Sequence, residues 1–110
     1  MSGWADIASA AAGPTTDLQK ALRSPRETQL RLLKCILSQN AHTSFGLTHD
    51  FATLETLEDY TNRIPIRSYE EFEPWIVRAA GGEPNVLTND PIVAFEQTGG
   101  SASGGKLVPY

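Results

Sequence analysis

The pattern of apolar and polar residues predicts a well-defined helix after Ser24. The stretch Ser24-Pro25-Arg26-Glu27 has the sequence of a capping box, with a Ser cap, a Pro at the first helical position and a Glu three residues after the cap. An apolar stripe at helical spacing then continues to about Gln39 and consists of Leu30, Leu33 and Leu37, flanked by Leu32 and Ile36. We expect this wide stripe to be buried, together with Cys35.

A second capping box, Ser68 with Glu71, predicts another helix that stops at Gly81-Gly82. Its apolar residues share one face and are Phe72, Trp75, Ile76 and Ala79. Pro74 lies inside this pattern, so we expect either a kink or a restart of the helix at that residue.

The remaining helical signals are shorter. Ala8–Ala12, before Gly13-Pro14, indicates a short helix or a loose arm, and a separate short helix is expected from Thr16 to before Pro25. Residues 40–50 are rich in hydroxyl and amide side chains and predict an ordered turn region. Thr56 with Asp59 can cap a short helix that Pro65 ends.

The character of the chain changes near its end. Pro91–Gln97 and Lys106–Tyr110 are short and apolar, which favours two paired strands, and between them lies the sequence TGGSASGG, residues 98–105. The predicted fold class is therefore α/β: a mostly helical part over residues 1–90, followed by strand, glycine-rich loop and strand over residues 91–110.

Composition narrows the possible partners. The 110 residues carry a net charge of -4 without a cluster of Lys or Arg, so neither nucleic acid nor an anionic membrane is expected as a partner. One cysteine excludes an internal disulfide, and no basic, apolar leader is visible at the start, so the expected location is cytoplasmic.

The glycine-rich loop carries the strongest chemical signal. Its glycines allow backbone N–H groups to approach phosphate oxygens, its hydroxyls can donate further hydrogen bonds, and a Lys adds charge. The candidate phosphate-binding residues are Thr98, Gly99, Gly100, Ser101, Ser103, Gly104, Gly105 and Lys106. A flexible hairpin tip is the competing interpretation, because Gly/Ser-rich loops usually have that role.

Two other sites are less favoured. Gly100–Lys106 satisfies the front of a P-loop, but Leu107 stands where a Ser or Thr should reach magnesium, and Val108-Pro109 disfavours the helix that a P-loop opens. His42 and His49 lack a third ligand at metal-binding spacing, so no metal site is expected in this chain.

Several short motifs, in order, resemble the start of the Gretchen Hagen family of acyl-acid-amido synthetases, which belong to the adenylate-forming superfamily. The resemblance runs from about Thr16 to Tyr110. It rests on Gln39-Asn40, Thr43, Phe45-Gly46, Phe51, Ile64-Pro65-Ile66, Tyr69-Glu70, Pro74-Trp75-Ile76, Gly82-Glu83, Leu87-Thr88 and TGGSASGGKLVPY. Plant members have Ser where Gly99 stands, so the loop is more similar to that of bacterial members.

The resemblance implies a two-step ligase reaction. A carboxylic acid attacks the α-phosphate of ATP to give an acyl-adenylate, and an amine or amino acid then displaces AMP. By the same resemblance, Thr98, Ser101 and Ser103 would donate hydroxyl hydrogen bonds to the β- and γ-phosphates. Gly99, Gly100, Gly104 and Gly105 would donate backbone N–H groups, and Lys106 would add a contact.

Residues 1–110 are thus interpreted as the amino-terminal portion of a large adenylation domain that requires the remainder in the same or another chain. The resemblance implies that the adenine and ribose contacts, the magnesium ligand, the acyl pocket and a mobile carboxy-terminal domain lie downstream of the loop. We therefore expect the chain to be inactive alone. The alternative is a stand-alone helical binding or assembly module, or a partner subunit, with a flexible loop.

Overall fold

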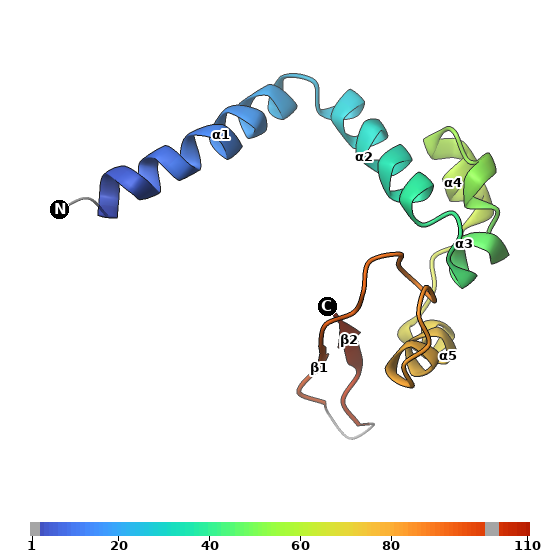
Figure 1. Ribbon diagram of the computed structural model, residues 1–110. Helices are drawn as coiled ribbons and strands as arrows, with labels where there is room; N and C mark the ends of the chain where they lie inside the picture. Colours follow the sequence, from blue (N-terminus) through green and yellow to red (C-terminus); the bar gives the residue numbers. More distant parts are fainter. Residues whose placement is uncertain (1–2, 101–103) are drawn as a thin grey trace. The chain divides into compact units, whose positions relative to one another are not determined.

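The computed structural model describes residues 3–100 and 104–110. The chain divides into two compact units, residues up to Leu33 and residues 34–110. Helices make up most of it, and a two-stranded antiparallel hairpin follows them at the carboxy-terminal end, as predicted (Figure 1). Over the described part of the chain, no helix combines the length and the apolar character needed to span a membrane.

Helix α1 is continuous from Gly3 to Arg23. The prediction of a short helix or arm over Ala8–Ala12 and a separate helix from Thr16 is therefore wrong, although the helix does end before Pro25. Pro14 removes one helical hydrogen bond, and the alanines before it have the highest helix propensity, which favours continuation. Two hydroxyls after Pro14 donate to carbonyls one turn back, Thr15 to Ala11 at 2.7 Å and Thr16 to Ala12 at 2.9 Å.

Helix α2 spans Pro25–Gln39, close to the predicted bounds. In the predicted capping box, the Ser24 N–H would donate to the Glu27 side chain. In the structure it donates instead to the Ala21 carbonyl at 3.2 Å. Of the apolar stripe, α2 buries Leu37 alone, and Cys35 is exposed. The expected burial of the whole stripe and of Cys35 is thus not found.

Phe45 forms the centre of the core in the second unit. It lies in α3 (Ser44–Thr48), and its ring centroid is 5.3 Å from that of Trp75 and 5.7 Å from that of Phe72. The rings of Phe51 and His49 lie at 5.8 and 4.1 Å. The buried apolar residues are Leu37, Ala41, Phe45, Phe51, Leu54, Ile76, Ala79 and Val86.

Local capping fixes α3 within the predicted turn region. Thr43 is 1% exposed; its hydroxyl accepts the Gly46 N–H at 2.9 Å and donates to the Asn40 carbonyl at 2.8 Å. The first two N–H groups of α3 donate to carbonyls far along the chain, Ser44 to Asn85 at 2.8 Å and Phe45 to Val86 at 2.9 Å. These bonds tie α3 to the segment that leads into the hairpin.

The two later helices begin where their capping boxes predict. After the 3-10 turn η1 (Phe51–Thr53), helix α4 spans Leu57–Arg63, and the Asp59 carboxylate accepts the Thr56 N–H at 2.9 Å. Helix α5 spans Tyr69–Ala80, and Glu71 accepts the Ser68 N–H at 2.8 Å. Helix α5 continues through Pro74 without a restart, and its buried residues are Ile76 and Ala79.

Strands β1 (Phe95–Gln97) and β2 (Leu107–Pro109) pair in antiparallel register, with Phe95 opposite Pro109 and Gln97 opposite Leu107. Both are shorter than the predicted strands, but the pairing extends further, because Tyr110 donates to the Ala94 carbonyl at 2.9 Å. Proline is tolerated in β2 because Phe95 and Pro109 form a pair that exchanges no ladder bonds.

Candidate phosphate-binding loop

The stem of the glycine-rich loop is closed by Thr98 and Lys106. The Thr98 N–H donates to the Lys106 carbonyl at 2.9 Å, and the Lys106 N–H donates to the Thr98 hydroxyl oxygen at 3.0 Å. The structure thus brings together the two ends of the predicted site. The Thr98 hydroxyl, although it accepts here, keeps its hydrogen available for a ligand.

Two glycines of the loop are required by its geometry. Gly104 has φ of +85°, a conformation that residues with a side chain rarely adopt. A Cβ added at Gly100 would lie 2.7 Å from the Gly104 carbonyl oxygen. Gly99 and Gly105 also lie in the described loop, at its two sides, whereas the candidates Ser101 and Ser103 lie outside the described residues.

The segment after the loop is a strand rather than a helix. Leu107–Pro109 forms β2, which agrees with the expectation that Gly100–Lys106 is not the front of a P-loop.

Tyr69, the first residue of α5, holds the strand that leaves the loop. The Leu107 N–H donates to the Tyr69 hydroxyl oxygen at 2.8 Å, and that hydroxyl lies 3.3 Å from the Leu107 carbonyl oxygen, to which it donates. Sequence reasoning gave Tyr69 no role beyond its place in a family motif. A contact across 38 positions has no local signal that could have revealed it.

The Lys106 side chain lies against the start of α5. Its ammonium is 3.8 Å from a carboxylate oxygen of Glu70 and 5.1 Å from the centre of the Tyr69 ring. The pKa of Glu70 lies below its ordinary value. The largest cause is the hydrogen bond that its carboxylate accepts from its own backbone N–H, followed by the hydrogen bond from the Ser68 hydroxyl and by the positive charge of Lys106. Since both ionic side chains are about half exposed or more, Lys106 can leave this pairing for a stronger anion.

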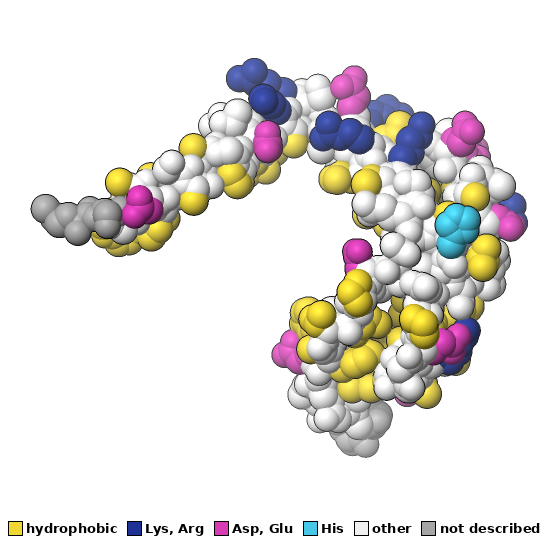
Figure 2. Space-filling view, viewed as in Figure 1, with side chains coloured by type: hydrophobic (Ala, Val, Ile, Leu, Met, Phe, Trp, Pro, Cys, Tyr) yellow, Lys and Arg dark blue, Asp and Glu magenta, His cyan; other side chains and the backbone are white. Residues whose placement is uncertain are grey.

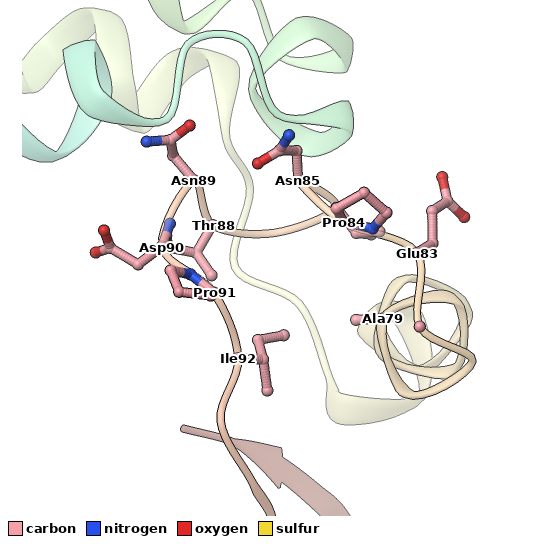
Figure 3. A pocket seen from close by; sticks show the side chains of 11 residues that line it. Ala79, Glu83, Pro84, Asn85, Thr88, Asn89, Asp90, Pro91 and Ile92 are labelled. Atoms are coloured by element: carbon pink, nitrogen blue, oxygen red, sulfur yellow. Dashed lines mark hydrogen bonds between the residues drawn. The ribbon is translucent and has the colours of Figure 1, made fainter.

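A cleft of about 290 Å³ lies beside the carboxy-terminal part of α5 (Figure 3). Its lining comes from Ala79, from residues 82–86 and from residues 88–92, and the segment after α5 carries the amide side chains of Asn85 and Asn89. This segment is held in place by Asn40, whose side-chain oxygen accepts the Asn89 N–H at 2.8 Å. Of the predicted phosphate-binding residues that the structure describes, none lines the cleft.

Among the residues that the structure describes, no three His, Cys, Asp or Glu side chains gather in a group that could hold a metal ion. His49, one of the two histidines considered above, is 5% exposed, and its Nδ1 lies 2.8 Å from the Phe45 carbonyl oxygen. Its ring therefore packs in the core and bonds to the backbone.

A helical lead-in followed by a hairpin around a glycine-rich loop is the class of structure that the resemblance implied. Residues 15–110 match the family described as GH3 family N-terminal domain, and the chain belongs to the GH3 family.

Two similar proteins are acid-amido synthetases of Arabidopsis thaliana. Indole-3-acetic acid-amido synthetase GH3.5 is 33% identical over 85 residues, which are 76% of this chain and 14% of that protein. Indole-3-acetic acid-amido synthetase GH3.15 is 30% identical over 94 residues, 84% of this chain and 16% of that protein. The chain therefore spans about one-seventh of the length of these relatives.

A solved structure shows the same fold. The AtGH3.15 acyl acid amido synthetase in complex with 2,4-DB superimposes with a TM-score of 0.67 at 28% identity, covering 74% of this chain and 15% of that one.

Proposed function

We propose that this chain supplies the loop that grips the β- and γ-phosphates of ATP in an acid-amido synthetase. In the reaction, a carboxylate oxygen attacks the α-phosphorus of ATP and pyrophosphate leaves, giving an acyl-adenylate. The amine nitrogen of an amino acid then attacks the acyl carbon, AMP leaves, and the nitrogen loses a proton. Membership of the GH3 family supports this proposal together with the loop's closed stem.

Each part of the loop has a role in that proposal. The hydroxyls of Thr98, Ser101 and Ser103 donate to phosphate oxygens, and the backbone N–H groups of the four glycines add further donors. Lys106 exchanges Glu70 for a phosphate oxygen, since a polyphosphate carries more negative charge than one carboxylate. Donors placed where charge develops on the departing pyrophosphate lower the barrier to adenylation.

Other parts of the reaction are assigned elsewhere. We place the magnesium ligand, the acid pocket and the amine pocket in the remainder of the adenylation domain, in the same chain or in another. The chain alone is then expected to be inactive, and the complete enzyme is expected in the cytoplasm. We also propose that the complete enzyme is more similar to bacterial than to plant members of the family, because Gly99 stands where plant members have Ser.

The test compares three glycine variants in the protein that contains this chain together with the rest of its adenylation domain. Gly100→Ala and Gly104→Ala should each lower kcat/KM for ATP by about tenfold or more in an ATP-pyrophosphate exchange assay, because the first meets the Gly104 carbonyl and the second strains φ. Gly13→Ala, in α1, is the matched control, since an added Cβ there meets no described atom within 4 Å. Full activity of both loop variants would refute the assignment.

A second candidate, a helical binding or assembly module, is favoured by one observation. Helix α1 buries no residue, and its apolar side chains gather mainly along one edge of the helix (Figure 2). Among its apolar residues, Trp4 is 84% and Leu22 67% exposed. If this is the function, Trp4→Ala should abolish binding of a protein partner, while the loop variants leave it unchanged.

A further inference from the structure

We infer that Tyr69 is a positioning residue for ATP, which fixes the strand that leaves the phosphate loop and thereby the place of Lys106. The inference rests on the proposed function of the loop. It assigns to the first turn of α5 a part in nucleotide binding that the glycine-rich sequence does not reveal.

Hydrogen-bonded and non-hydrogen-bonded residue pairs alternate along the hairpin, and this alternation explains why Leu107 needs a partner other than β1. Ala94 with Tyr110 and Thr98 with Lys106 exchange bonds across the hairpin, and bonded pairs alternate with non-bonded ones along an antiparallel ladder. Leu107, which is opposite Gln97, therefore directs its N–H and carbonyl away from β1. These are groups that a third strand would bind.

The Tyr69 hydroxyl takes the place of that third strand. It accepts the Leu107 N–H at 2.8 Å and donates to the Leu107 carbonyl at 3.3 Å, so one side-chain oxygen bonds to both groups. Pro109, the next residue that faces this edge, has no N–H to satisfy. The outer edge of β2 is thus held at one point, one residue after Lys106.

The same Tyr69 side chain also contacts Lys106 itself. The Lys106 ammonium lies 5.1 Å from the ring centroid, where the ring attracts a cation. Tyr69 therefore reaches the backbone of one stem residue and the charged group of the preceding one. Without the hydroxyl contact, β2 could shift, and Lys106 and Gly105 would no longer be held in one position. Phosphate binding would then weaken, because its donors would be less well positioned.

The variant that isolates the hydroxyl is Tyr69→Phe, which keeps the ring beneath Lys106. Tyr60→Phe is the matched control, because Tyr60 is a half-buried tyrosine in α4. In the isolated chain, hydrogen exchange of the Leu107 amide should speed up by about three- to tenfold in Tyr69→Phe and stay unchanged in Tyr60→Phe.

In the enzyme that contains the rest of the adenylation domain, Tyr69→Phe should raise KM for ATP by about three- to tenfold and leave KM for the acid unchanged. A merely structural role would lower the amount of folded enzyme and leave both Michaelis constants unchanged. An active wild-type enzyme whose KM for ATP does not respond to Tyr69→Phe would overturn this inference alone. A wild-type enzyme without ATP-pyrophosphate exchange would overturn the proposed function, and the inference with it.

Discussion

Arg78, in the last turn of α5, binds Glu83 through two guanidinium nitrogens. Its Nε donates to one carboxylate oxygen at 2.8 Å, and its Nη2 donates to the other. The same Nη2 donates to the Ser44 hydroxyl at 3.1 Å, and the guanidinium carbon lies 5.3 Å from the centre of the Trp75 ring. This one side chain joins the end of α5, the segment after it and the start of α3.

Arg78→Lys should destabilise this junction, because a Lys ammonium keeps the charge but cannot form the planar two-bond contact. The hydrogen bonds from Arg78 lower the pKa of Glu83 and raise that of Arg78. We expect a modest fall in the urea midpoint, since both side chains are more than 40% exposed and solvent screens the pair. Lys20→Arg, the reverse change in α1, is the control, and an equal midpoint for wild type and Arg78→Lys would contradict the expectation.

Two isoleucines give a matched test of where the core lies. Ile76 is 6% exposed and Ile66 is 102% exposed. Ile76→Ala should cost about 2 to 4 kcal/mol of unfolding free energy, through lost burial and the cavity left behind. Ile66→Ala should change it by less than about 0.5 kcal/mol. Chemical denaturation of the isolated chain measures both, and similar costs would show that the core is placed wrongly.

Two prolines test why α1 is continuous. Pro14→Ala should stabilise α1, because it restores a backbone N–H inside the helix. A proline inside a helix is less favourable than alanine by about 3 kcal/mol. Pro25→Ala should have little effect, since the first residue of α2 needs no helical N–H bond. Far-UV circular dichroism during heating should show residual helix persisting to higher temperature in Pro14→Ala alone. If α1 were two separate helices, the two variants would behave alike.

Asp59 makes part of the stability depend on pH. Its pKa lies below the ordinary value because its carboxylate accepts hydrogen bonds from the Thr56 hydroxyl and from the N–H groups of Thr56 and Glu55. The unfolded chain therefore takes up the proton at a higher pH than the folded chain. The stabilisation is fully present above the unfolded pKa of about 4 and is lost as the pH falls through the folded value.

Asp59→Asn should flatten the acid limb of the stability curve, because an amide does not titrate in this range. Urea unfolding between about pH 6 and pH 3 measures the slope for both proteins. Asp17→Asn, in α1 and outside this capping box, is the control, and a slope unaffected by Asp59→Asn would show that the capping carboxylate does not carry the effect.

The local elements could be read from the sequence, since their causes lie within four residues. The Thr56/Asp59 and Ser68/Glu71 signals identified the starts of α4 and α5, and the strand-loop-strand pattern identified the hairpin. Continuity of α1 was missed because Gly13-Pro14 usually ends a helix, and here the flanking alanines outweigh that preference. The exposure of Cys35 was missed because an apolar stripe does not say whether anything covers it.

By itself, the sequence determined where α2, α4 and α5 lie, where the glycine-rich loop lies and which family motifs surround it. Only the tertiary structure decided that Tyr69 binds Leu107, that Asn40 holds Asn89 and that the start of α3 binds residues 85 and 86. The physical reason is range: capping and periodicity act between near neighbours, whereas these contacts join residues 38 to 49 positions apart. Such contacts form only when burial of the Phe45 cluster has brought the segments together.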